Sequence, residues 1–156
     1  MEKSKNKILN TWIKVLDNNK IKYVLNEENA TIRFNSSDIS DFSKYKPEII
    51  IKAEDKSYCA YAELPVIITE ETLDGISSYV FKVNKNPLCA HFTLDLDSKS
   101  VFCTHGTFCG TDIPDKTVIA TSLGCIGAFL DEFYKGLKSI AEKNISAEVA
   151  YEKNSD

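Results

Sequence analysis

The sequence predicts an α+β fold in which one antiparallel β-sheet is flanked by three α-helices. Two kinds of periodicity predict this fold. Several short segments alternate apolar and polar residues, whereas three longer segments repeat apolar residues every three or four positions. The segments do not follow the regular β-α-β order of a parallel sheet, so hairpin-connected strands are expected. The predicted order is helix, strands, helix, β-hairpin and long C-terminal helix.

The first half of the chain is predicted to form one helix and four strands. An amphipathic pattern predicts a helix over residues 4–18. Alternation and β-branched residues predict strands over residues 21–25, 30–34, 49–51 and 58–64. We expect Pro65 to end the last strand, because proline cannot donate a hydrogen bond to a strand ladder.

The second half is predicted to form a helix, a hairpin and a longer helix. Thr69 is a candidate N-cap for a helix that ends before Asn86-Pro87. Strands are predicted over residues 89–96 and 101–105, followed by a loop over 106–112 and a helix over 114–143. The chain of 156 residues suits a single α+β domain over residues 1–147, with a loose C-terminal tail over 148–156.

Composition excludes some classes of partner. The net charge is −4, and Arg33 is the one arginine among 19 basic residues. Arginine dominates phosphate and base contacts, so neither nucleic acid nor an anionic membrane is an expected partner. The N-terminal residues lack the apolar segment of a signal peptide, and no apolar run is long enough to span a bilayer, so we expect a cytoplasmic protein.

Residues 76–141 resemble a known family. The segments that carry the resemblance are Val83-Asn84-Lys85-Asn86, Phe92-Thr93-Leu94-Asp95-Leu96-Asp97 and Phe129-Leu130-Asp131-Glu132-Phe133-Tyr134. They are similar to YbjN-like, or type III secretion chaperone-like, domains. That resemblance implies the order helix, three strands, helix, two strands, helix, in a small protein that often dimerises and acts by binding other proteins. This chain departs from the pattern in having four strand-like segments before the second helix, and in its Cys/His-rich hairpin.

Five residues of the hairpin and the loop after it are candidate metal or redox groups: Cys89, His91, Cys103, His105 and Cys109. A two-residue loop at Ser98-Lys99 would place the two Cys-x-His pairs on opposite faces of the sheet. A loop one residue longer would unite all five residues on one face. The spacing Cys-x-His is atypical of structural zinc sites, and the alternative is that the cysteines are buried as small hydrophobic residues.

Disulfide bonds are not expected. The chain has five cysteines, an odd number at irregular spacings, which is unlike a disulfide framework. We therefore expect free thiols, as in a reducing compartment.

The last helix carries a stripe of small residues, which are Ala120, Gly124, Gly127 and Ala128. Glycine inside a helix is unfavourable by up to about 1 kcal/mol relative to alanine. A stripe of this kind lets another backbone approach closely. The sequence leaves open whether that backbone belongs to the same domain or to a second subunit.

By resemblance, we expect a non-enzymatic protein-binding module, chaperone-like or regulatory, that acts as a homodimer on a protein partner of unknown identity. The alternative is a metal-binding or thiol-redox-responsive protein that uses the Cys/His hairpin. The sequence carries no catalytic signature and no cofactor-binding motif, so neither catalytic residues nor a cofactor are predicted.

Overall fold

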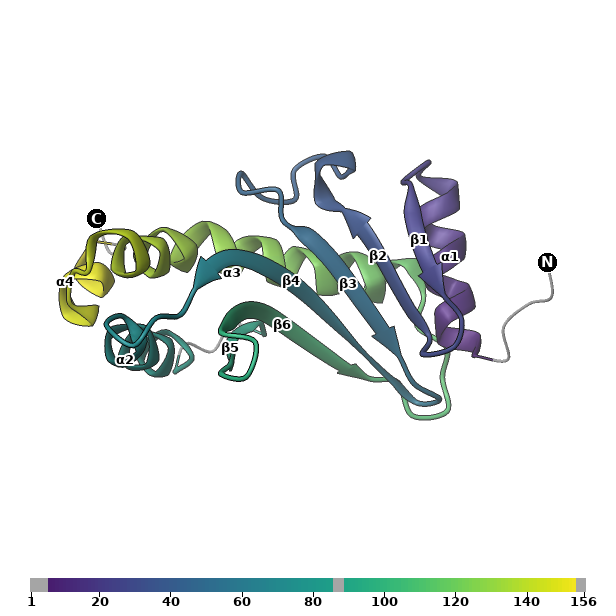
Figure 1. The fold of residues 1–156 in the computed structure, drawn as a ribbon. Helices are drawn as coiled ribbons and strands as arrows, with labels where there is room; N and C mark the ends of the chain where they lie inside the picture. The colour runs from purple at the N-terminus through teal and green to yellow at the C-terminus, as the bar shows by residue number, and fades with distance from the viewer. Residues whose placement is uncertain (1–5, 86–88, 154–156) are drawn as a thin grey trace.

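The fold is a six-stranded antiparallel sheet with four α-helices, which confirms the predicted fold class and adds one helix to it. The computed structural model describes residues 6–85 and 89–153 (Figure 1). Its elements, in chain order, are α1 (Lys7–Asn18), β1 (Tyr23–Asn26), β2 (Thr31–Asn35), the 3₁₀ helix η1 (Ser36–Asp38), β3 (Glu48–Ala53), β4 (Ser57–Ile67), α2 (Leu73–Val83), β5 (His91–Asp95), β6 (Ser100–Phe108), α3 (Lys116–Lys143) and α4 (Ala147–Glu152). The strand order in the sheet is β1-β2-β3-β4-β6-β5.

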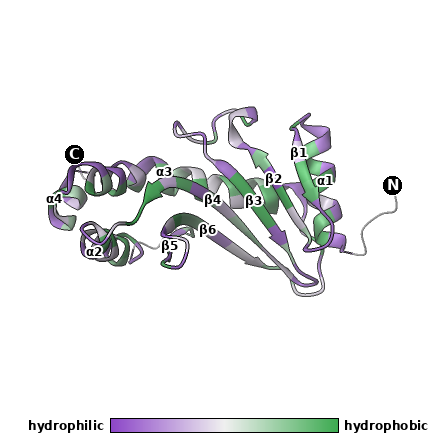
Figure 2. Cartoon of the chain, viewed as in Figure 1, coloured by the Kyte–Doolittle hydropathy of each residue, from purple (hydrophilic) through white to green (hydrophobic). Residues whose placement is uncertain are grey.

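The helix α3 covers one face of the sheet and leaves the other face open. In Figure 1 the helix passes behind the strands, so the open face is turned toward the viewer. Alternation along β4 produces this division, because Tyr58, Ala60, Ala62, Leu64 and Val66 are buried while the residues between them are partly or fully exposed. The same alternation appears as changing hydropathy along the strands in Figure 2.

Both ends of α3 are capped. The side chain of Asp115 accepts hydrogen bonds from the backbone N–H groups of Thr117 and Val118, at 2.8 and 2.9 Å. Asn144 ends the helix in the left-handed conformation, with φ of 48°. The helix therefore begins two residues later than the sequence predicts and ends at the predicted residue.

Strand β4 continues past the point where the sequence predicts its end. It runs through Pro65 to Ile67, and its pairing with β6 shifts register between Leu64 and Ile67. A bulge at this place accommodates Pro65, which has no backbone N–H to donate to the neighbouring strand. Strand β6 is also longer than predicted, because residues 106–108 pair with β4 instead of forming a loop.

The ends of α2 and the chain after α3 differ from the sequence prediction as well. Helix α2 begins at Leu73, and Thr69 lies one turn earlier, where its hydroxyl is 3.0 Å from that of the N-cap Thr72. Part of the segment predicted as a loose tail forms α4, in which Ala147 and Ala150 are buried. This helix lies against α2 and α3 at one end of the molecule (Figure 1). Among the helices of the described segments, none combines the length and apolar composition needed to cross a bilayer.

A buried polar contact joins the middle of the sheet to α3. The hydroxyl groups of Tyr58 and Ser122 are 2.7 Å apart, and each residue is about 1% exposed. The ring of Tyr58 also meets the edge of Trp12 from α1, with centroids 5.4 Å apart. Tyr58 of β4 therefore contacts both α1 and α3.

We expect Ser122→Ala to lower the free energy of unfolding by about 1–3 kcal/mol, because it leaves the buried hydroxyl of Tyr58 without its partner. Tyr58→Phe should lower it by about 0.5–1.5 kcal/mol, because Ser122 keeps its hydrogen bond to the carbonyl oxygen of Val118. The double variant should lose less than the sum of the two, since it removes both groups together. Urea denaturation of the four proteins measures this difference. Strictly additive losses would show that the contact contributes nothing.

Candidate functional site

The register of the β5–β6 hairpin places the predicted Cys/His residues. Asp95 pairs with Ser100, so four residues connect the strands, which is longer than either loop considered from the sequence. Phe92 pairs with Cys103 on the inner face, and His91 pairs with Thr104 on the open face. Cys103 and His91 thus lie on opposite faces of the hairpin, as the shorter of the two loops considered implies, while Cys89 lies before the paired part of β5.

Among the described residues, three of the five predicted ones do not belong to a close group of possible metal ligands: Cys103, Cys109 and His91. Cys103 is fully buried, and this burial raises the pKa of its thiol. Burial and the nearby carboxylate of Asp112 raise the pKa of Cys109. Partial burial, followed by the charge of His105, lowers the pKa of His91. A raised thiol pKa reduces the thiolate fraction, so neither Cys103 nor Cys109 is an activated nucleophile.

Cys89 forms a disulfide bond with Cys125, which corrects the expectation that all five thiols are free. Cys89 lies just before β5, and Cys125 lies in the middle of α3, with Cα atoms 5.9 Å apart. The bond therefore ties α3 to the outer strand of the sheet. No local spacing indicates it, because the two residues are 36 positions apart and meet only when the helix packs on the sheet.

His105 lies beside the disulfide. One ligand atom from each of Cys89, His105 and Cys125 can be chosen so that all three lie within 4.8 Å of one another. Of the residues that the structure describes, these form the one group of three or more His, Cys, Asp or Glu side chains with such spacing. Sequence reasoning named Cys89 and His105 for this chemistry and missed Cys125.

A chain of hydroxyl groups holds the imidazole of His105. Its Nδ1 is 3.0 Å from the carbonyl oxygen of Cys89, and its Nε2 is 3.1 Å from the hydroxyl of Thr107. Thr107 continues to Ser122 at 3.3 Å, and Ser122 to Tyr58. Because a carbonyl can only accept, Nδ1 donates to Cys89, and in the neutral imidazole Nε2 accepts from Thr107.

The small-residue stripe of α3 is divided between an internal contact and an open groove. A Cβ atom on Gly127 would overlap the backbone carbonyl oxygen of Phe42, so this glycine is required inside the domain. A Cβ on Gly124 would meet nothing within 4 Å. Ala120 and Gly124 line a groove of about 660 Å³, and Ala128 is exposed one turn beyond Gly124.

The groove lies between α1, the segment 38–42 and the first half of α3. Its walls are mostly apolar, and its charged lining residues are Asp38, Asp41 and Lys116. The apolar lining residues include Val15, Leu16, Ile21, Ile39, Phe42, Ile119 and Leu123. An apolar groove with charges of both signs is suited to binding another polypeptide.

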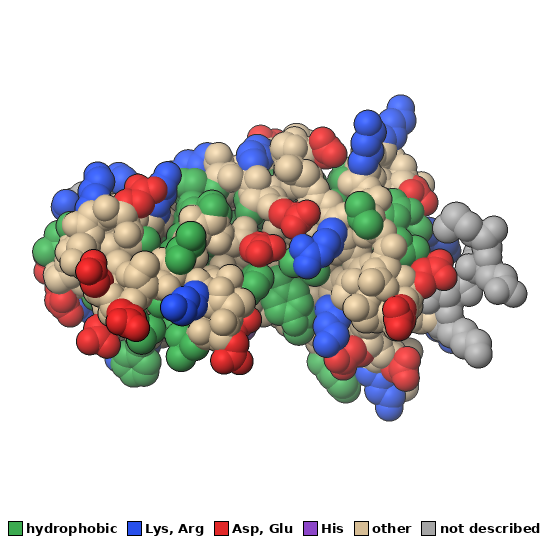
Figure 3. All heavy atoms as spheres, in the orientation of Figure 1, with side chains coloured by type: hydrophobic (Ala, Val, Ile, Leu, Met, Phe, Trp, Pro, Cys, Tyr) green, Lys and Arg blue, Asp and Glu red, His purple; other side chains and the backbone are tan. Residues whose placement is uncertain are grey.

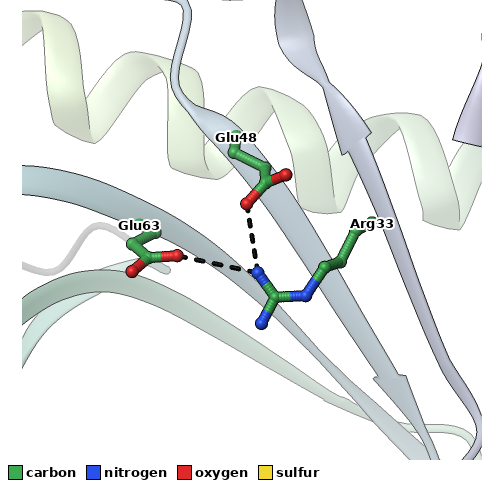
Figure 4. A network of polar contacts seen from close by, with 3 residues as sticks. All are labelled: Arg33, Glu48 and Glu63. Carbon is green, nitrogen blue, oxygen red and sulfur yellow. Dashed lines mark hydrogen bonds and ion pairs between the residues drawn. The ribbon is translucent and has the colours of Figure 1, made fainter. Parts of the chain in front are cut away.

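The open face of the sheet is more polar. Arg33 of β2 reaches over the neighbouring strands, where its Nη1 is 3.1 Å from Glu48 and 3.7 Å from Glu63 (Figure 4). All three side chains are about half exposed, so the network contributes little stability. Figure 3 shows acidic, basic and apolar side chains mixed over this face. A shallower hollow of about 250 Å³ lies there, beside the edge-to-face rings of Tyr61 and Phe102.

We expect loss of the disulfide to lower the free energy of unfolding by about 2–4 kcal/mol, because the bond restricts the unfolded chain across 36 positions. Cys125→Ala should show this loss in urea denaturation, and reduction of the unmodified protein should match it. Cys109→Ala, which changes a free thiol, is the matched control and should differ by less than about 1 kcal/mol. Equal stability of Cys125→Ala and the unmodified protein would contradict a stabilising role for the disulfide.

The two glycines should respond in opposite directions to alanine. Gly124→Ala should raise the free energy of unfolding of the single chain by about 0.5–1 kcal/mol, because alanine favours the helix and no described atom of the chain lies within 4 Å of its Cβ. Gly127→Ala should lower it by about 1–3 kcal/mol, because the backbone at Phe42 must move. Thermal and urea denaturation of both variants measure these changes in stability. Changes of the same sign would refute the assignment of Gly127 to an internal contact and of Gly124 to open space.

The sequence matches no protein-family model and no curated protein. Solved structures do resemble the fold. YbjN from E. coli, proposed to be a transcription regulator, aligns with a TM-score of 0.58 at 12% identity, over 81% of this chain and 90% of that chain. An uncharacterized protein from Methanothermobacter thermautotrophicus aligns with a TM-score of 0.50 at 17% identity, over 86% and 96%.

A third structure, the heterodimeric ExoU-SpcU complex from the type III secretion system of Pseudomonas aeruginosa, aligns with a TM-score of 0.44 at 19% identity, over 62% of this chain and 76% of that chain.

The four strand-like segments that the sequence predicts before the second helix are confirmed, since β1 to β4 precede α2. The alignment with YbjN, over most of both chains, confirms the resemblance at the level of the fold. The chain therefore has a YbjN-like fold.

Proposed function

We propose that this chain is a non-enzymatic protein-binding module, chaperone-like or regulatory, that acts as a homodimer in the cytoplasm. The fold supports a regulatory role by analogy, since YbjN shares the fold and is proposed to be a transcription regulator. The observation that carries the proposal is the open groove beside α3, where the helix exposes small residues at Ala120 and Gly124.

The spacing of the small residues favours a helix as the occupant of this surface. Ala120, Gly124 and Ala128 follow one another at intervals of four, so they form a stripe along one side of α3. All three are exposed, and a helix backbone can approach such a stripe more closely than it can approach large side chains. In a symmetric pair, the α3 of a second copy supplies a matching stripe.

The charges at the groove support self-association in the same way. Lys116 lies at the start of α3, and Asp38 and Asp41 lie on the opposite wall. A two-fold interface brings the same patch together from both copies, so a lysine of one copy can meet an aspartate of the other. Groups of both signs in one groove are therefore compatible with a self-complementary contact.

The disulfide between Cys89 and Cys125 is relevant to the proposed cytoplasmic location, because a reducing compartment limits how long the bond can persist there. Cytosolic disulfides are usually transient, serving catalysis or redox sensing. A cytoplasmic homodimer of this chain would therefore contain Cys89 and Cys125 in both oxidised and reduced forms.

Gly124→Leu tests the homodimer. A Cβ atom at Gly124 meets nothing within 4 Å in the described chain, so the leucine side chain should be accepted by the fold while it keeps a second copy out of the groove. Sedimentation velocity should find a dimer for the unmodified protein and a monomer for the variant. The dissociation constant of the variant's dimer should be at least about 10-fold larger than that of the unmodified protein. Circular dichroism and the melting temperature should confirm that the variant is folded.

Glu132→Leu is the matched control, because Glu132 is an exposed residue of α3 that does not line the groove. It should leave the dimer intact. A monomeric unmodified protein at high micromolar concentration would contradict the homodimer. A dimer that survives Gly124→Leu would place the interface elsewhere.

A further inference from the structure

The group formed by Cys89, Cys125 and His105 has the chemistry of a soft-metal site. It brings two sulfur atoms and one imidazole within 4.8 Å of one another. The three residues come from three parts of the chain: the segment before β5, the middle of α3 and strand β6. Thiolate and imidazole are the ligands that Zn²⁺ prefers, and three protein ligands with a water in the fourth position are a common arrangement.

The hydrogen bonds of His105 define its tautomer. Its Nδ1 donates to the carbonyl oxygen of Cys89, which leaves the lone pair on Nε2. Metal-binding histidines are usually held in this manner by a hydrogen bond at the other ring nitrogen. The hydroxyl of Thr107, which occupies Nε2, has an alternative acceptor in Ser122 at 3.3 Å and can therefore release it.

The disulfide and a metal cannot use the same sulfur atoms at the same time. In the oxidised form the sulfur atoms are bonded to each other, and neither is a thiolate. A dithiol reductant supplies two electrons and two protons, its own thiols become a disulfide, and the bond between Cys89 and Cys125 breaks to give two thiols. A Zn²⁺ ion then displaces the two thiol protons and binds both thiolates.

The distances permit this exchange with small movements. Zinc bonds of about 2.3 Å to sulfur and 2.0–2.1 Å to nitrogen place tetrahedral ligand atoms about 3.5–3.8 Å apart. The sulfur atoms must separate, while the ligand atom of His105 starts within 4.8 Å of each of them. Cys89 is exposed, so a reductant can reach the bond.

We propose that the reduced protein binds one Zn²⁺ ion through Cys89, His105 and Cys125. Oxidation of the two thiolates by a small-molecule disulfide, which takes up the two electrons and two protons and becomes two thiols, re-forms the Cys89–Cys125 bond and releases the ion. This zinc site is independent of the groove and of the proposed homodimer. It also differs from the five-residue site considered from the sequence, because it includes Cys125 and excludes His91, Cys103 and Cys109.

The experiment compares oxidised and reduced protein, each incubated with one equivalent of Zn²⁺, desalted and measured by native mass spectrometry. The reduced protein should retain one zinc ion per chain, and the oxidised protein should retain none. Co²⁺ should produce thiolate-to-cobalt charge-transfer absorption in the reduced protein alone. Native mass spectrometry also counts subunits, so failure of the zinc site is distinguished from failure of the homodimer.

Four variants locate the site. Cys125→Ala and His105→Ala should each weaken zinc binding by at least about 100-fold, since loss of a supporting residue alone costs 10–100-fold. His105→Ala keeps both cysteines, so its oxidised form retains the disulfide and provides a folded reference. Cys109→Ala and His91→Ala are matched controls, and both should bind zinc as the unmodified protein does.

Several results would overturn the proposal. Reduced protein that holds no zinc, whether folded or unfolded, excludes the site. Zinc retained equally by the oxidised protein, or by His105→Ala and Cys125→Ala, places the ion elsewhere. Zinc lost equally from the two control variants assigns it to other residues.

Discussion

The packing of α3 across the inner face of the sheet positions both the groove and the cysteine pair of the disulfide. This helix is 28 residues long, and its buried side faces strands β4 and β6. The contact between Tyr58 and Ser122 fixes its rotation at the middle of the sheet. With that side fixed, Cys125 is placed beside the outer strand β5, and Gly124 is left on the wall of the groove.

Periodicity was sufficient to predict most of the fold, because burial on one side imposes it directly. The alternation in residues 30–34 and 58–64 and the repeat in 114–143 identified β2, β4 and α3 close to their observed bounds. The prediction was wrong where a neighbouring strand determines the structure. Pro65 and residues 106–108 continue their strands because β4 and β6 pair along almost their full lengths, and no local pattern carries that information.

The candidate site was less predictable for the same reason. Which face a hairpin residue occupies depends on strand register, and a shift of one residue reverses every assignment. The four-residue connection after Asp95 determines that Cys103 is buried while His91 lies on the open face. Cys125 could not be assigned at all from sequence, because it joins Cys89 only through the packing of α3. Long-range contacts of this kind leave no mark in the spacing of the residues.

The two glycines of the α3 stripe show how one residue type can have two different physical reasons. Each is unfavourable in a helix by about 1 kcal/mol relative to alanine. At Gly127 the carbonyl of Phe42 occupies the space of a side chain, so the contact within the domain accounts for the glycine. At Gly124 the described chain places nothing within 4 Å of a Cβ atom, so no internal contact accounts for it. An exposed glycine in a helix leaves room for another backbone to approach closely, and the homodimer proposed above uses that room at the groove.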